Sequence, residues 1–214
     1  MCYPFVMDMS APSSVLLTRT EGRVLSTLAG TTRPLSGREV ARLSGASPNG
    51  AWRTLRRFVE HGLVSEREAG GRTLLYTLNR EHVAADAALR LTDLRAELID
   101  RLTTRIKSWI VPPVHVSLFG SAARGDGDTG SDVDLVVVRP RDVDEEDEQW
   151  RTQLDGLADA VLGWSGNHAG ISEIPRGDIA RLGRERPAIL DELEQDAITL
   201  FGPSVRELLA ANRR

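Results

Sequence analysis

Residues 119–137, FGSAARGDGDTGSDVDLVV, are the stretch that decides the fold of this chain. The residues before it, 114–118, alternate in polarity, which predicts a strand that runs up to Gly120-Ser121 and ends there. A small residue at this point lets a phosphate approach the backbone, and the Ser121 hydroxyl and the free N–H groups of a short following helix can hold phosphate oxygens. The turn therefore predicts an anion-binding site.

A second strand, DVDLVVV at 132–138, follows a polar, glycine-rich connection. Side chains two residues apart on a strand share a face, so we expect Asp132 and Asp134 to project together. Two carboxylates this close repel each other unless a cation lies between them. Because carboxylates hold divalent metals against nucleotide phosphates, the pair predicts a metal site beside the Gly120-Ser121 turn.

Together these motifs resemble the signature of the polymerase-beta-like nucleotidyltransferase superfamily, and most nearly its minimal nucleotidyltransferase (MNT) branch. In that branch three motifs recur, and here they are Gly120-Ser121, Arg124-Gly125-Asp126 and Ser131-Asp132-Val133-Asp134-Leu135. The resemblance implies that Asp132 and Asp134 are catalytic and bind Mg²⁺ or Mn²⁺. It also implies that Gly120, Ser121 and Arg124 hold the nucleotide.

The superfamily usually takes a third carboxylate from a later strand. The candidate strand is 169–174, AGISEI, and its only acid is Glu173. We therefore expect Glu173 as the third catalytic residue. A solvated strand residue is the alternative, and the nearby Asp178 looks more like a helix start.

Residues 19–80 predict three helices followed by a hairpin. Ser36 and Glu39 show the Ser-x-x-Glu pattern of a capping box, and Ser47-Pro48 offers a cap and a first-turn proline for the next helix. Two segments, 63–68 and 72–78, flank a glycine turn and predict the paired strands of a hairpin.

This order resembles a winged helix-turn-helix domain of the kind found in MarR- and ArsR-like regulators. On that resemblance, the helix beginning at Pro48 enters the DNA major groove. The residues that we expect to contact DNA are Asn49, Arg53, Arg56 and Arg57 on this helix and Arg72 in the wing. A solvated helix face, or a protein-contact module, is the alternative interpretation.

Charge favours the DNA interpretation. Residues 19–80 contain 11 Arg and 5 Glu, a net charge of +6, whereas the whole chain carries −4. A basic segment attached to an acidic remainder fits contact with nucleic acid at one end, because phosphate neutralisation supplies much of the affinity.

The chain is expected to be an α+β protein of two domains. The predicted segments are a winged helix-turn-helix domain at 19–80, a linker helix at 81–110 and a mixed-sheet nucleotidyltransferase domain at 111–214. The leucine-rich stripe of the linker predicts packing on the catalytic domain or pairing in a homodimer. Val111-Pro112-Pro113 is expected to end that helix.

Composition excludes several other classes. No apolar run approaches the length of a membrane span, and the N-terminus lacks the pattern of a secretory signal. Cys2 is the only cysteine, which excludes an intramolecular disulfide and a zinc site built on cysteine pairs. We therefore expect a cytoplasmic protein.

The resemblance implies transfer of a nucleoside monophosphate from a nucleoside triphosphate, with AMP from ATP as the expected case. The acceptor is expected to be a hydroxyl of a protein or a nucleic acid. Members of the minimal branch often act as antitoxins that modify a HEPN-type toxin, and an attached winged helix fits autoregulation. The alternative is a transcription regulator whose nucleotidyltransferase domain senses nucleotide, or contacts a partner, without catalysis.

Overall fold

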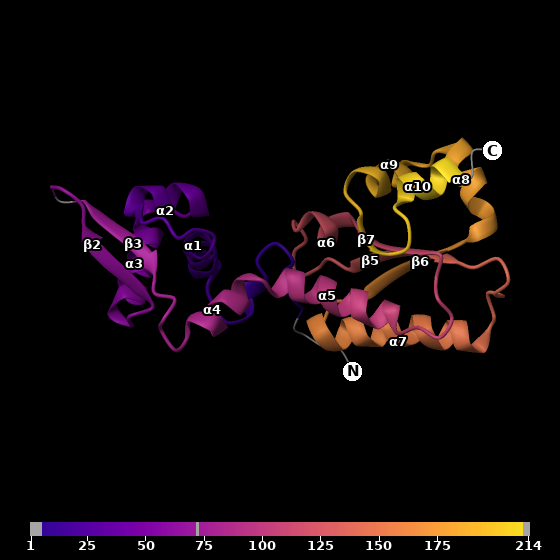
Figure 1. The fold of residues 1–214 in the computed structure, drawn as a ribbon, viewed down its shortest axis with the longest axis horizontal. Coiled ribbons are helices and arrows are strands. Elements are labelled where there is room, and N and C mark those ends of the chain that lie inside the picture. The colour runs from indigo at the N-terminus through magenta and orange to yellow at the C-terminus, as the bar shows by residue number, and fades with distance from the viewer. Residues whose placement is uncertain (1–5, 72, 212–214) are drawn as a thin grey trace. The chain divides into compact units, whose positions relative to one another are not determined.

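The computed structural model describes residues 6–71 and 73–211 and divides the chain into two compact units (Figure 1). Residues 11–94 form one unit, which we call the inserted unit. The chain on both sides of it, up to Ser10 and from Arg95, forms the larger unit. The predicted linker helix, 81–110, spans the point at which the units divide. Cys2 and Arg72 lie outside the described residues.

The inserted unit contains three helices followed by a wing, as the sequence predicts. Its sheet is antiparallel with the strand order β1-β3-β2, and the α3 helix precedes the hairpin. Its elements are η1 (Pro12–Val15), α1 (Arg19–Ala29), β1 (Leu35–Ser36), α2 (Gly37–Ser44), α3 (Pro48–Glu60), β2 (Val64–Glu68), β3 (Leu74–Leu78) and α4 (Ala85–Thr92).

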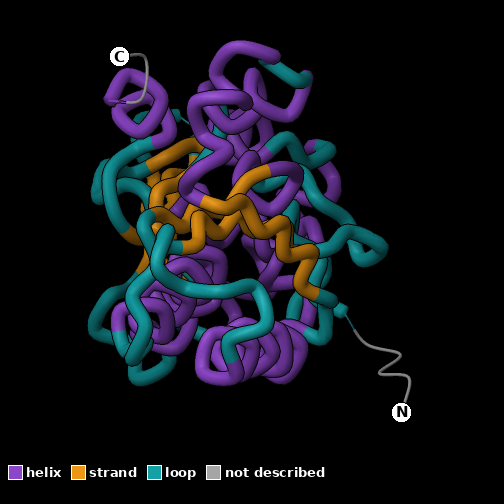
Figure 2. Tube along the Cα trace, turned by 90° about the vertical axis from the view of Figure 1, so that its right-hand side faces the viewer, coloured by secondary structure: helices purple, strands orange, loops and turns teal. Residues whose placement is uncertain are grey.

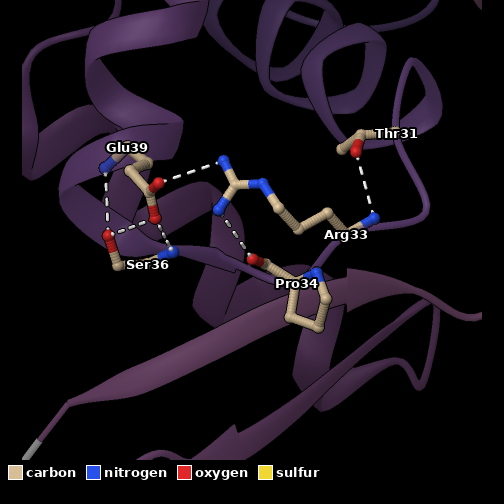
Figure 3. A network of polar contacts seen from close by, with 5 residues as sticks. All are labelled: Thr31, Arg33, Pro34, Ser36 and Glu39. Atoms are coloured by element: carbon tan, nitrogen blue, oxygen red, sulfur yellow. Dashed lines mark hydrogen bonds and ion pairs between the residues drawn. The ribbon is translucent and has the colours of Figure 1, made fainter.

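The capping box predicted at the start of α2 is present (Figure 3). The Ser36 backbone N–H donates to Glu39 Oε2 at 2.8 Å, and the Glu39 N–H donates back to Ser36 Oγ at 3.3 Å. Arg33 donates to the other carboxylate oxygen at 3.0 Å. The Ser36 hydrogen bonds, with Arg33, lower the pKa of Glu39 from 4.5 to about 2. The box therefore holds an ionised carboxylate at the helix N-terminus.

The stretch predicted as one linker helix forms two helices, α4 and α5 (Leu94–Lys107), which belong to different units. The Thr92 hydroxyl donates to the Leu89 carbonyl at 2.6 Å, and the Asp93 N–H donates to the Arg90 carbonyl at 3.1 Å. These bonds span three residues and tighten the last turn of α4. The leucine stripe continues across the break, so hydrophobic periodicity alone predicts one continuous helix.

The larger unit contains a four-stranded mixed sheet with the order β6-β5-β4-β7. The β4 strand is antiparallel to β5 and β7, whereas β5 and β6 are parallel. The elements after α5 are β4 (His115–Phe119), α6 (Gly120–Arg124), β5 (Val133–Arg139), α7 (Glu148–Ser165), β6 (Ala169–Pro175), η2 (Arg176–Asp178), α8 (Ile179–Glu185), α9 (Ala188–Gln195), β7 (Ile198–Phe201) and α10 (Val205–Ala211). These elements and the wing confirm the α+β fold class.

Both faces of this sheet are covered by helices, which Figure 2 shows in purple above and below the orange strands. Val133, Leu135 and Val137 of β5 join a core with α5 and α7. Val136 and Val138 join a second core with α8, α9 and α10. Odd and even positions of β5 therefore face different helical layers, as strand alternation requires. Among the described residues, no helix is long and apolar enough to cross a membrane.

Residues 7–10, which we call the N-terminal strap, complete the larger unit. The Met7 N–H donates to the Ser165 carbonyl at 2.9 Å, and Met9 is 1% exposed in the core with α5 and α7. The Ser10 N–H donates to the Gly127 carbonyl at 2.7 Å. The strap therefore holds the loop 125–132, which connects α6 to β5.

Asn167 joins the strap to the same loop. Its side-chain Nδ2 donates to the carbonyls of Met7, at 3.2 Å, and Ser131, at 2.9 Å. Its Oδ1 accepts the Met7 N–H at 3.1 Å, and the residue is 1% exposed. A single buried amide thus fixes the residue that precedes Asp132.

We expect Asn167→Ala to lower the free energy of unfolding by about 2 kcal/mol, because it leaves buried backbone groups without partners. Thermal unfolding of the full chain measures this loss. The exposed Asn49 supplies the matched control, Asn49→Ala. Equal stability of the two variants would contradict the role given to Asn167.

Candidate active site and nucleic-acid interface

The carboxylate of Asp134 lies between two glycines, Gly120 directly after β4 and Gly170 in β6. In the sheet register, Asp134 pairs with Phe119 at the end of β4 and with Gly170 of β6. A Cβ atom at Gly120 would lie 2.6 Å from Asp134 Oδ2, and one at Gly170 would lie 2.8 Å from Oδ1. Both positions therefore need glycine for the carboxylate to occupy this place.

Gly120 has a second reason to be glycine, since its φ of 66° lies in the left-handed region. This conformation ends β4 and turns the chain into α6. Sequence reasoning identified Gly120 and missed Gly170. The sequence signal for Gly170 was a glycine within a predicted strand, which often marks a position where another group approaches the backbone closely.

Asp134 is the second residue of β5 and Asp132 directly precedes the strand, close enough for its charge to act on the Asp134 carboxyl. Asp132 is exposed and Asp134 is half-buried. Burial, followed by the charges of Asp132 and Glu192, raises the pKa of Asp134 above 3.8. Uncompensated negative charge is therefore concentrated at the start of β5. The oxygen ligands fit a hard divalent cation such as Mg²⁺ or Mn²⁺.

The α6 helix places Ser121 and Arg124 on the chain that leads away from Gly120. The Ser121 carbonyl accepts the N–H groups of Gly125, at 2.8 Å, and Asp126, at 3.1 Å. Arg124 Nε donates to Asp126 Oδ2 at 3.1 Å, and Nη1 lies 3.8 Å from Asp196 Oδ2. The guanidinium is exposed, so these carboxylates are partners that a phosphate would have to replace.

Arg95 supports this helix from α5, a role that sequence reasoning missed. Its Nε donates to the Ala122 carbonyl at 3.1 Å, and its Nη2 donates to the Ala123 carbonyl. The guanidinium thus satisfies carbonyls that a five-residue helix leaves without intrahelical donors. Sequence periodicity contains no signal for this contact because it joins residues 27 and 28 positions apart.

Glu173 does not join the two aspartates. In the parallel register it pairs with Val137, so its side chain lies on the α5 and α7 face of the sheet, opposite to Asp134. Its carboxylate accepts a hydrogen bond from Arg139 Nε. We therefore correct the expectation that Glu173 completes the site. Within the described ranges, His, Cys, Asp and Glu form no group of three that could hold a metal.

Asn49, Arg53, Arg56 and Arg57, the four residues of α3 expected to contact DNA, are all exposed. Arg57 also forms an ion pair with α1, where its Nη1 lies 2.7 Å from Glu21 Oε1. Helical periodicity did not predict this ion pair. Arg57 lies at the edge of the polar stripe of α3, and its side chain is oriented by Glu21 of α1. Arg57 stays a candidate contact, as Arg56 does, and each has a carboxylate partner that a phosphate would have to replace. Arg72, outside the described residues, stays a prediction.

We expect Asp134→Asn to raise the unfolding temperature of the metal-free protein at pH 7, because burial and the charge of Asp132 oppose the ionised carboxylate. A raised carboxyl pKa means that ionisation destabilises the folded state. This penalty is absent below the unfolded pKa of about 3.9 and complete above the folded pKa. The unfolding temperatures of Asp134→Asn and the wild type should therefore become equal below a pH of about 3.9.

Calorimetry across this pH range, with and without MnCl₂, measures the effect. Metal should raise the unfolding temperature of the wild type and not that of the variant. Asp155→Asn, on the exposed face of α7, is the matched control. A variant less stable than the wild type at pH 7 without metal would refute the assigned repulsion.

We expect Gly170→Ala to weaken Mn²⁺ binding about tenfold or more, because the added methyl group would lie 2.8 Å from Asp134 Oδ1. Titration followed by electron paramagnetic resonance measures free Mn²⁺. Gly163→Ala on α7 is the control, since no atom lies within 4 Å of its added methyl group. Unchanged affinity in Gly170→Ala would show that this glycine does not shape the site.

Comparison with family models identifies both parts of the chain. Residues 97–174 match the nucleotidyltransferase domain, and residues 22–68 match the IclR helix-turn-helix domain. The motif-based recognition of these two domains is thereby confirmed. No curated protein matches the chain.

Among solved structures, the chain is similar to the toxin-antitoxin MntA-HpeT mutant D39ED41E, with 12% identity and a TM-score of 0.38 over 53% of this chain and 82% of that chain. RV1404 from Mycobacterium tuberculosis has 24% identity and a TM-score of 0.36 over 45% and 68% of the two chains. Lactococcus lactis ZitR in complex with DNA has 19% identity and a TM-score of 0.32 over 44% and 66%. Similarity at this level supports no conclusion about function.

Proposed function

We propose that this chain, which contains a nucleotidyltransferase domain and a helix-turn-helix domain, is an active transferase of nucleoside monophosphates that also binds DNA. The donor is a nucleoside triphosphate, with ATP as the preferred case. The acceptor is a hydroxyl group of a protein or a nucleic acid.

The observation that carries this proposal is the placement of Asp134. Gly120 at the start of α6 and Gly170 in β6 stand where an added Cβ atom would collide with its carboxylate, although burial and Asp132 both oppose its ionisation. The end of a strand without a function would not require a half-buried carboxylate between two glycines. A cation that binds both carboxylates accounts for it.

This geometry supports the following reaction. Asp132 and Asp134 would hold Mg²⁺, which when bound supplies positive charge to the triphosphate oxygens. Gly120 leaves the backbone open to the phosphates, and Ser121 and Arg124 supply donors for them. The acceptor oxygen forms a bond to the α-phosphorus, the bond from that phosphorus to the bridging oxygen breaks, and pyrophosphate leaves. The hydroxyl proton passes to solvent.

The second domain supports a regulatory setting for this chemistry. Asn49, Arg53 and Arg56 lie on the exposed face of α3, where a recognition helix contacts DNA. The motif resemblance to the minimal branch supports an antitoxin-like role, in which a HEPN-type toxin is the acceptor. Binding to the promoter of its own gene would then couple expression to the presence of that partner.

One observation favours a second candidate function, a regulator that binds nucleotide without turnover. Glu173 faces away from the aspartates, and among the described residues His, Cys, Asp and Glu form no group of three that could hold a metal. In this case the triphosphate changes DNA affinity, and no label is transferred. The two candidates differ in a single measurement.

We expect the purified protein, incubated with MgCl₂, α-labelled ATP and host lysate, to transfer label to protein or RNA. Asp132→Ala should reduce this transfer at least about a hundredfold, because the metal loses a ligand. Asp155→Ala is the matched control and should retain full activity. Absence of transfer with each of the four triphosphates, together with triphosphate-dependent DNA binding, would replace the transferase with the nucleotide-sensing regulator.

A further inference from the structure

A groove with a volume of about 1070 Å³ opens on the inserted unit between α2, α3 and β3. Trp52 of α3 and Leu74 of β3 supply exposed apolar surface, and Arg38 and Arg42 of α2 supply positive charge. Tyr76 of β3 also lines the groove. An apolar centre with cationic walls therefore lies between the helix-turn-helix and the wing.

Trp52 is exposed to solvent, although tryptophan side chains in proteins are mostly buried. Its side chain is 55% exposed, and it occupies the fifth position of α3, a helix whose buried residues belong to the core of the unit. Exposed aromatic surface beside other apolar groups often marks a binding site. Core packing gives no reason for tryptophan here.

A neighbouring arginine holds the ring in place. The guanidinium carbon of Arg56 lies 5.6 Å from the centroid of the Trp52 ring. Arg56 Nε in turn donates to Glu60 Oε1 at 2.9 Å, one turn further along α3. The ring is thus supported from its own helix, and its other contacts are available to an incoming partner.

The charge of the walls indicates what that partner is. Arg33 pairs with Glu39, and Arg57 pairs with Glu21. Arg38 and Arg42 are exposed, and neither forms an ion pair within residues 6–71 and 73–211. Two unneutralised cations beside a recognition helix fit the phosphates of a duplex, which supply much of the affinity without sequence information.

We propose that Trp52 reads a thymine in the major groove through the C5-methyl group of that base. The inference rests on the proposed DNA-binding function. Residues in the first half of a recognition helix reach base edges, and Trp52 lies there between Asn49 and Arg53. In the major groove only thymine presents a methyl group, and apolar side chains contact it. Arg38 and Arg42 would hold the flanking phosphates.

The test begins with duplexes selected from a random pool by the full-length protein. Each thymine of a selected site is then replaced in turn by deoxyuridine, which removes the methyl group and keeps the hydrogen-bonding pattern. At one position the wild type should lose about fourfold in affinity, the factor that corresponds to ~0.8 kcal/mol for one buried methyl group. Trp52→Ala should bind the thymine and deoxyuridine duplexes equally.

Two controls separate recognition from folding and from charge. Val83→Ala removes an exposed apolar residue outside the groove and should retain the fourfold difference. Trp52→Phe should retain part of it, because an aromatic ring still meets the methyl group. The salt dependence of affinity should be the same in Trp52→Ala and the wild type, since the phosphate contacts are unchanged.

The possible failures are distinguishable. If the wild type binds no duplex in a salt-dependent manner, the DNA-binding function itself fails, and this inference fails with it. If the wild type binds selected duplexes but no deoxyuridine position weakens binding, only the role of Trp52 is refuted. A methyl effect that persists in Trp52→Ala would also refute it.

Discussion

The confinement of one carboxylate organises the larger unit. Asp134 fits between β4 and β6 only because both neighbours supply glycine, and Gly120 must also adopt a left-handed conformation there. That conformation ends β4 and starts α6, whose carbonyls Arg95 then satisfies. The loop that returns to β5 is held by the strap through Gly127 and by Asn167. Strand end, short helix and loop thus follow from one packing constraint.

This arrangement has an energetic cost that the surrounding layers offset. Burial and the neighbouring Asp132 both disfavour the ionised form of Asp134. The next residues of β5 lie in two separate apolar cores, one with α5 and α7 and one with α8, α9 and α10. Apolar side chains therefore pack on both faces of β5, while the carboxylates at its start, Asp132 and Asp134, stay polar. Functional sites commonly depart from the most stable solution in this way.

Local patterns in the sequence predicted local structure well. The Ser36 capping box, the hairpin and the Asp132 and Asp134 pair depend on residues close in the chain, and each is present. The direction of Glu173 depends on the register between β5 and β6, and a one-residue slip reverses the face of every side chain. The ion pair of Arg57 was not predicted for a related reason, because its partner Glu21 belongs to another helix.

The strap gives the chain an order of folding. Residues 11–94 are contiguous and contain their own core, so this unit can fold as soon as it leaves the ribosome. Met7 is synthesised before this unit, yet its partner Asn167 lies 160 residues later than Met7. Closing so long a loop is slow compared with helix formation. The strap thus stays without its partner until a much later segment is made, and the loop 125–132 acquires its final form only after α3 is complete.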